Sequence, residues 1–410
     1  MPRFLRCLAA VVLLSWVSLP TAAAEPFRQD RFALGLWVPP QTNDDLEFRY
    51  RELAEANFNL VIGNSPVPVA DQLRVCDHLG LKALVHVPGA VETWPTNASC
   101  WGYLLRDEPG VADFPGLAQS VADLRRLRPG RLAYVNLFPN YANAGQLGAT
   151  NYEEHVARFL ADVKPEVLSM DHYPLMRPAA DRRDAYCENL ETFRRHSVAA
   201  GVPFWNFFHS MPFADRMDPT EAQIRWQIYA AVAYGAKGVL YFCYWTPGKG
   251  NAGTGEFPKG GALLTAEGRR TRHYDEAKRI NAELKNLGPT LMQLTGEGVR
   301  RVHTGQEPAR VLTHSPVLNL QRVTGDPHAE FLVGSLRHAD GRRAVLLVNH
   351  DHAYTAWPTV TFDAAPETVR EVDKATGAEV PLTDDSPELP GVQLSFGAGD
   401  GRLFLLPAAR

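Results

Sequence analysis

The chain has 410 residues, more than one ordinary hydrophobic core accommodates and enough for two domains. Hydrophobic residues make up 45% of the sequence and charged residues 21%, a composition that excludes a largely disordered chain. The net charge is -4 and there is no basic block to neutralise phosphates, so nucleic acid is not a predicted partner.

Residues 1–24 have the pattern of a signal peptide. Arg3 and Arg6 form a short basic region, an apolar run follows over residues 8–19, and three alanines precede Glu25. This run is too short to span a bilayer well, and no later stretch reaches about 20 apolar residues. We therefore expect a mature protein that begins near Glu25 and is secreted or periplasmic, with no membrane contact after cleavage.

Four cysteines remain in the expected mature chain, and they allow three disulfide connectivities. A pair between Cys76 and Cys100 suits an oxidising compartment, whereas small buried thiols are the alternative. The sequence leaves both open.

Short apolar runs alternate with amphipathic segments through the first two thirds of the chain. Runs that are apolar nearly throughout and rich in Val, Leu, Phe and Tyr are typical of strands buried on both faces. The eight predicted strands cover residues 33–38, 59–63, 83–87, 103–105, 132–137, 167–170, 204–208 and 239–244. Since no Gly-x-Gly-x-x-Gly follows the first of them, the pattern favours a (β/α)8 barrel over a doubly wound sheet.

The predicted helices lie between these strands. One begins at Asp218 as its capping residue, one spans residues 117–124, and one runs from about residue 267 to a stop at Gly288-Pro289. Only residues 88–100 lack a helical pattern. After Gly288, seven short strand patterns separated by turn residues predict an antiparallel β-sandwich. The expected organisation is a signal peptide over 1–24, a barrel over 25–290 and a sandwich over 291–410.

In a barrel of this kind, reactive groups lie where strands end and βα loops begin. The polar and aromatic residues at those positions are Asn64, His86, Arg106, Asp107, Glu108, Asn136, Asp171, His172, Tyr173, Asn206, His209 and Trp245. Histidine pairs with metal-ligand spacing are missing, so no metal or other cofactor is predicted.

Glu108 is the candidate general acid, because glycoside cleavage needs a carboxylic acid to protonate the departing oxygen. Arg106 and Asp107 beside it would set its pKa through their charges. Asp171 is the candidate second carboxylate, or else it holds a substrate hydroxyl while His172 or Tyr173 contacts the reacting centre.

Arg106, Asp107, His172 and Tyr173 are also predicted to bind substrate. Trp245 is interpreted as an aromatic platform for a sugar ring, and Asn136, Asn206 and His209 as hydrogen-bonding groups. His86 is interpreted as an interior histidine.

Residues 102–109, Gly-Tyr-Leu-Leu-Arg-Asp-Glu-Pro, resemble glycoside hydrolase family 42 and other clan A barrels, as do Met-Asp-His-Tyr-Pro at 170–174 and Asn-Ala-Glu-Leu-Lys-Asn-Leu-Gly-Pro at 281–289. The resemblance implies a retaining glycosidase with an acid/base glutamate after strand four, where Glu108 stands, and a nucleophilic glutamate after strand seven. The sequence departs from this pattern in two places: Asp107 replaces the usual asparagine, and strand seven has no glutamate.

Three alternatives supply the missing group: Asp171, Glu256 in the loop after strand eight, or a substrate-assisted reaction in which Asp107 and Glu108 act on a 2-acetamido sugar. We favour Asp171. The predicted function is an exported glycoside hydrolase acting on a β-linked hexoside of an extracellular or cell-wall oligo- or polysaccharide. A barrel that binds carbohydrate without cleaving it is the rival prediction, and a transglycosylase would use the same residues.

Overall fold

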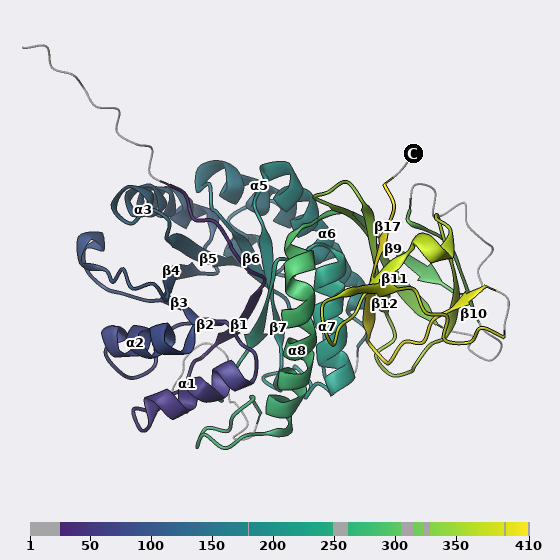
Figure 1. Cartoon of the computed structure of the whole chain (residues 1–410). Helices are drawn as coiled ribbons and strands as arrows, with labels where there is room; N and C mark the ends of the chain where they lie inside the picture. Colours follow the sequence, from purple (N-terminus) through teal and green to yellow (C-terminus); the bar gives the residue numbers. More distant parts are fainter. Residues whose placement is uncertain are drawn as a thin grey trace, which may run out of the picture.

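The computed structural model describes residues 25–178, 180–248, 261–304, 315–322, 329–388 and 391–408. The predicted signal peptide and Glu256 lie outside these ranges. The chain folds into a closed eight-stranded parallel barrel, followed by two antiparallel sheets (Figure 1). This is the predicted fold class.

All eight barrel strands form where the apolar runs predicted them. They pair in sequence order, and β8 closes the barrel against β1. The strands are β1 Ala33–Trp37, β2 Leu60–Ile62, β3 Lys82–Val85, β4 Cys100–Asp107, β5 Leu132–Leu137, β6 Leu168–Asp171, β7 Phe204–His209 and β8 Gly238–Phe242.

Helices cover the outside of the barrel, and loops connect them to the strands. They are α1 Leu46–Glu55, α2 Val69–Leu79, α3 Phe114–Leu127, α4 Ala144–Leu147, α5 Tyr152–Asp162, α6 Arg183–Ala200, α7 Glu221–Ala233 and α8 Arg272–Met292, with short 3-10 turns η1 Val91–Thr93 and η2 Val111–Asp113. As predicted, the crossover before β4 contains no α-helix, only η1. Within the described ranges, no helix is both long and apolar enough to cross a membrane.

Three predicted helix ends were wrong, and one of them is the start of α8, which lies at Arg272 and not near residue 267. The cap of α7 is Thr220, which accepts a hydrogen bond from the Gln223 amide, because Asp218 instead pairs with His273 at 2.8 Å. Helix α8 continues through Gly288-Pro289 to Met292, so it crosses the predicted domain boundary at residue 290.

The barrel interior is a packed core, as in other (β/α)8 barrels. Trp205 on β7 stacks on Trp101 with ring centroids 6.3 Å apart, and Phe27 meets Trp101 edge-on at the amino-terminal end. Gly238 makes room for this cluster, since a Cβ there would lie 2.7 Å from the Trp205 ring. This aromatic cluster therefore fills the interior at the amino-terminal end of the strands.

The C-terminal region forms the predicted sandwich. Its six-stranded sheet has the order β15-β14-β17-β12-β11-β9 and its three-stranded sheet the order β10-β13-β16. The strands are β9 Leu294–His303, β10 Val317–Arg322, β11 Glu330–His338, β12 Arg343–Asn349, β13 Pro358–Phe362, β14 Arg370–Val372, β15 Glu379–Pro381, β16 Val392–Gln393 and β17 Gly401–Leu406, with the 3-10 turn η4 Pro366–Thr368. Strands β10 and β15 were not predicted.

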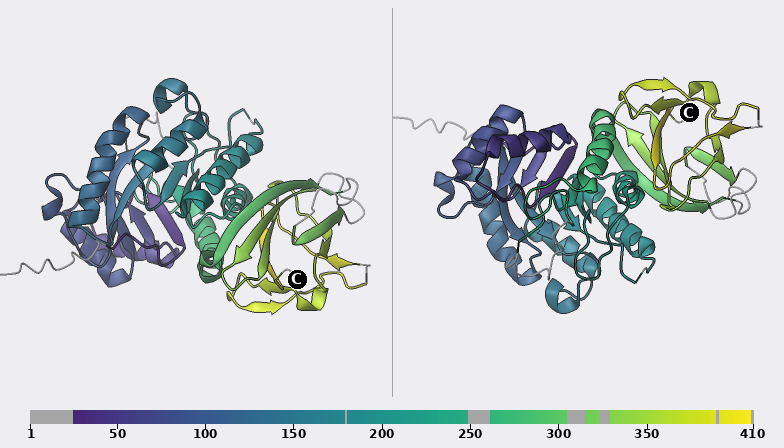
Figure 2. Two further views of the ribbon diagram at one scale, coloured as in Figure 1. Left: turned by 90° about the horizontal axis from the view of Figure 1, so that it is seen from above. Right: turned by 90° about the horizontal axis from the view of Figure 1, so that it is seen from below.

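The six-stranded sheet is buried on both faces. One face shares a core with the small sheet through Phe331 and Phe404, and the other packs on the barrel through Leu332 and Leu346. Helix α7 contacts β11 and β12, and α8 leads into β9 through a single residue. Figure 2 shows the barrel and the sandwich side by side along these helices.

All four cysteines of the expected mature chain are free thiols. Cys76 and Cys100 are both buried, and burial raises the pKa of each thiol above its usual value. They behave as small apolar side chains of the core, which was one of the two predicted alternatives.

Candidate active site

A bulge in β4 turns Asp107 into the barrel. The register with β5 pairs Leu104 with Tyr134 and Asp107 with Asn136, and it shifts between Leu104 and Arg106. Without the extra residue, strand alternation would place Asp107 on the outside. The bulge therefore delivers its carboxyl to the interior face.

Glu108 follows in a left-handed backbone conformation, with φ of 47°. Such a conformation is costly for a residue with a side chain and is found most often at functional sites. Its amide donates a hydrogen bond to the Asn136 carbonyl at 2.8 Å, which fixes the turn. The side chain is half-buried and hydrogen-bonded to Asp171, the last residue of β6.

Asn136 links the acids. Its amide nitrogen donates to Asp107 at 3.2 Å and to Asp171 at 3.1 Å, while its amide oxygen accepts from the Ser169 hydroxyl. Because Ser169 has only one proton to give, the Tyr134 hydroxyl must donate to Ser169, at 2.8 Å. This chain of bonds keeps the NH2 group of Asn136 turned toward the acids.

The pKa values of all three carboxyl groups are raised, and Glu108 and Asp171 are raised in part by the charges of their acidic neighbours. Burial and the neighbouring charge of Asp107 raise the pKa of Glu108 to about 7. Burial, followed by the charges of Glu108 and Asp107, raises the pKa of Asp171 well above its usual value. Partial loss of hydration also raises the pKa of Asp107, although its side chain is still reached by solvent at the open mouth. Glu108 and Asp171 therefore hold a shared proton near neutral pH.

Aromatic side chains occupy the other half of the mouth. Trp37 at the end of β1 meets Phe207 of β7 edge-on, with centroids 5.5 Å apart. Tyr173 lies 5.5 Å from Phe242, the last residue of β8, and the charges of all three acids raise its pKa further above the level set by burial. The half-buried Trp37, Tyr173 and Phe242 thus give the mouth an apolar wall facing its acidic one.

Tyr141 and Arg216 also lie at this end, and sequence reasoning missed both. Tyr141 is 50% exposed, and the guanidinium carbon of Arg216 lies 5.8 Å from the centre of its ring. Although half of the residue is exposed, burial around its hydroxyl and the charge of Asp171 raise the pKa of Tyr141 to about 12. Both residues come from irregular loops, where no periodic pattern indicates which side chains turn inward.

Three predicted substrate contacts point away from the interior. Arg106 takes the outward register after the bulge and lies 3.6 Å from Asp113. Asn206 is fully buried against α6 and donates to the Tyr186 hydroxyl at 2.7 Å. His172 turns to the same helix, bonding Asn189 at 3.0 Å, and burial lowers its pKa to about 4. These predictions failed because strand alternation puts the three side chains on the helix side.

Trp245 is not an exposed platform. Only 4% of it is accessible, its indole N–H donates to the Ala266 carbonyl, and Arg49 lies over its ring. His209 is fully buried, and burial lowers its pKa to about 3, so it is neutral. His86, predicted as an interior histidine, is instead exposed at the mouth.

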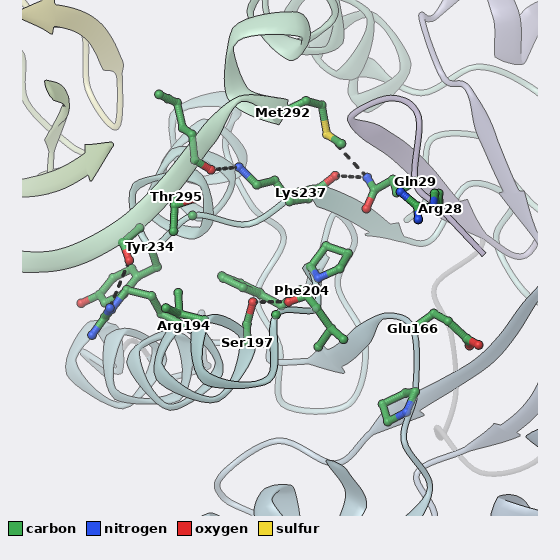
Figure 3. A pocket seen from close by; sticks show the side chains of 18 of the residues that line it. Arg28, Gln29, Glu166, Arg194, Ser197, Phe204, Tyr234, Lys237, Met292 and Thr295 are labelled. Atoms are coloured by element: carbon green, nitrogen blue, oxygen red, sulfur yellow. Dashed lines mark hydrogen bonds between the residues drawn. The ribbon is translucent and has the colours of Figure 1, made fainter. Parts of the chain in front are cut away.

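A cavity of about 830 Å³ lies at the opposite end of the barrel. Two of its polar side chains bind the protein's own backbone: Lys237 donates to the Leu291 and Leu294 carbonyls, and Gln29 donates to the Lys237 carbonyl at 2.6 Å, a bond drawn in Figure 3. This cavity is thus separate from the acids. Across the described residues, no His, Cys, Asp or Glu side chains are grouped as metal ligands.

Comparison with known proteins gives the fold and no family. No protein-family model and no curated protein matches the sequence. The solved β-galactosidase from Bacillus circulans sp. alkalophilus is 11% identical, with a TM-score of 0.57 over 94% of this chain and all (100%) of that one. The β-galactosidase from Marinomonas ef1 is 12% identical, with a TM-score of 0.48, and the match covers 62% of this chain and 60% of that enzyme's length. The barrel fold is therefore shared with glycoside hydrolases, while the family 42 resemblance stays a prediction.

Proposed function

We propose that this protein is a glycoside hydrolase in which Glu108 is the proton donor and Asp171 the second carboxylate. The observation that carries the proposal is the proton-sharing pair Glu108 and Asp171, with Asp107 beside it, at the carboxyl-terminal mouth of the barrel. A pKa near 7 keeps Glu108 protonated until a glycosidic oxygen arrives.

In this scheme, Glu108 transfers its proton to the leaving oxygen as the glycosidic bond breaks. Once the shared proton has left the pair, Asp171 is ionised and stabilises the positive charge that develops on the anomeric carbon. In this scheme a bound sugar takes the place of the bond between Glu108 and Asp171, and water then attacks the anomeric carbon and returns a proton to Glu108.

A substrate-assisted reaction is the second candidate, and the bulge favours it. Asp107 is turned inward directly beside Glu108, where it can accept the N–H of a 2-acetamido group. The sugar's own carbonyl oxygen then attacks the anomeric carbon while Glu108 protonates the leaving oxygen. In this scheme Asp171 shares a proton with Glu108 and does not touch the anomeric carbon.

The test is hydrolysis of aryl α- and β-glycosides, matching 2-acetamido glycosides and polysaccharides by the protein from Glu25 onward. Glu108→Gln should lose roughly 2 to 4 orders of magnitude in kcat on any substrate cleaved. Equal loss in Asp171→Asn supports the two-carboxylate scheme, whereas selective cleavage of 2-acetamido sugars with loss in Asp107→Asn supports the second. Glu367→Gln, an exposed acid of the sandwich, is the matched control. Binding of these sugars without any hydrolysis would contradict the proposal and would support a barrel that only binds carbohydrate.

We also propose that the chain is exported. The support is the signal-peptide pattern of residues 1–24. Amino-terminal sequencing of protein recovered from the periplasm or medium of a producing bacterium should begin near Glu25, and retention of Arg3 in that protein would contradict export by cleavage.

A further inference from the structure

Two large aromatic side chains stand exposed on one loop of the sandwich. Tyr354 is 73% and Trp357 is 50% accessible, and both lie between β12 and β13. Single exposed apolar residues are common on proteins, but two aromatic residues three positions apart on one loop form a local apolar surface. The Tyr354–Trp357 surface is therefore a candidate for binding.

The backbone holds Tyr354 in place. The Asp351 carboxylate accepts a hydrogen bond from the Tyr354 amide at 3.3 Å, and the Asn349 side chain donates to the Tyr354 carbonyl at 2.8 Å. Asn349 itself is fully buried, and it also donates to the Gly397 carbonyl. The ring is thus presented to solvent from a fixed backbone position, which lowers the entropy lost on binding.

Trp357 is held in a similar way by its neighbours. Ala356 exchanges two backbone hydrogen bonds with Phe396, at 3.0 and 2.8 Å, and the Pro358 carbonyl accepts from Leu394. A residue that precedes proline is also restricted to extended backbone. The two Cα atoms are at most about 11 Å apart, since an extended chain advances by about 3.6 Å per residue.

The loop lies at the same end of the barrel as the acids. The indole N–H of Trp226, in the first half of α7, donates to His350 at 3.1 Å, and Arg183, the first residue of α6, donates to the His350 carbonyl. Helices α6 and α7 begin where the loops from β6 and β7 end, which is the end that carries Asp171. The start of the loop that carries Tyr354 and Trp357, at His350, therefore packs at the mouth end of helices α6 and α7.

We propose that Tyr354 and Trp357 form an accessory carbohydrate-binding surface for a part of a polymeric substrate that extends beyond the barrel mouth. Sugar rings carry apolar C–H faces that pack on aromatic rings while their hydroxyl groups stay hydrated. The inference rests on the proposed function, because that function makes the substrate a carbohydrate. It adds that the substrate is a chain of several sugars.

The experiment compares the wild type with the double variant Tyr354→Ala/Trp357→Ala in two assays. Affinity electrophoresis in gels containing soluble polysaccharides measures binding without requiring turnover. The double variant should bind roughly 5- to 50-fold more weakly, the range that corresponds to the loss of two stacked rings. Its kcat/KM should fall on the polysaccharide and remain unchanged on an aryl monosaccharide.

Ring-retaining and remote variants make the result specific. Tyr354→Phe and Trp357→Tyr should keep most of the binding, and Leu318→Ala, at another exposed apolar position on β10, should keep all of it. Wild-type affinity in the double variant, or no binding of any polysaccharide by the wild type, would overturn the inference. Ring-dependent binding without cleavage would uphold the surface and contradict the proposed hydrolase, so the two failures are distinguishable.

Discussion

The carboxyl groups of Glu108 and Asp171 are hydrogen-bonded to each other, although one follows β4 and the other ends β6. Two such groups share a proton up to the pH at which the raised pKa of the pair is passed, which for Glu108 is about 7. The bond with Asp171 lowers the pKa of Glu108, whereas burial and the charge of Asp107 raise it, with a result of about 7. Glu108 is therefore protonated below that pH and can give a proton to substrate.

The first prediction concerns the pH dependence of the reaction. Because the pKa of Glu108 is raised to about 7, kcat/KM on a neutral substrate should be highest below that pH and fall as pH rises through it. The measurement is initial rates across a pH series on the best substrate of the panel. A flat rate through neutral and mildly alkaline pH would exclude Glu108 as the proton donor.

The second prediction concerns stability. In the unfolded chain a glutamate titrates near pH 4.3, so between about 4.3 and 7 the folded protein binds more protons than the unfolded chain. The contribution of Glu108 to stability is therefore fully present below that window and is lost as pH rises through it. In Glu108→Gln this pH-dependent loss of stability is absent. The urea concentration at the midpoint of unfolding should therefore be higher in the variant than in the wild type, and the difference should be larger at about pH 8 than at about pH 5. Equal differences at both pH values would contradict the raised pKa.

The third prediction distinguishes the role of Trp245 from that of Trp37. Trp245 is buried, so Trp245→Ala should destabilise the protein by about 3 to 5 kcal/mol while the molecules that remain folded keep the wild-type KM. Trp37 is half-buried on the apolar wall of the mouth, so Trp37→Ala should raise KM severalfold with a smaller change in stability. Thermal unfolding and initial rates at low temperature measure both quantities. A higher KM in Trp245→Ala alone would restore Trp245 as the sugar platform.

The strands were predictable because strands buried on both faces leave continuous apolar runs, and the acids were predictable because they directly follow two of these runs. Which face each side chain takes was not predictable. The bulge at Leu105 exchanges the inward and outward positions of Arg106 and Asp107, and nothing in the residues themselves marks it. Trp245 was misjudged for a similar reason, since its cover comes from a distant loop at Ala266.

The last prediction concerns the contact between the barrel and the sandwich. Gly334 on β11 faces the end of α7, and a Cβ at that position would lie 2.6 Å from the Ala233 carbonyl oxygen. Backbone atoms on both sides cannot move aside as a flexible side chain would, so Gly334→Ala must push the sheet away from the helix. We expect a lower Tm and, in calorimetry, a broadening or splitting of one cooperative transition into two. Gly298→Ala on β9 of the same sheet is the control, since nothing lies within 4 Å of its added Cβ. Identical unfolding of the two variants would show that the sheet does not depend on close contact with α7.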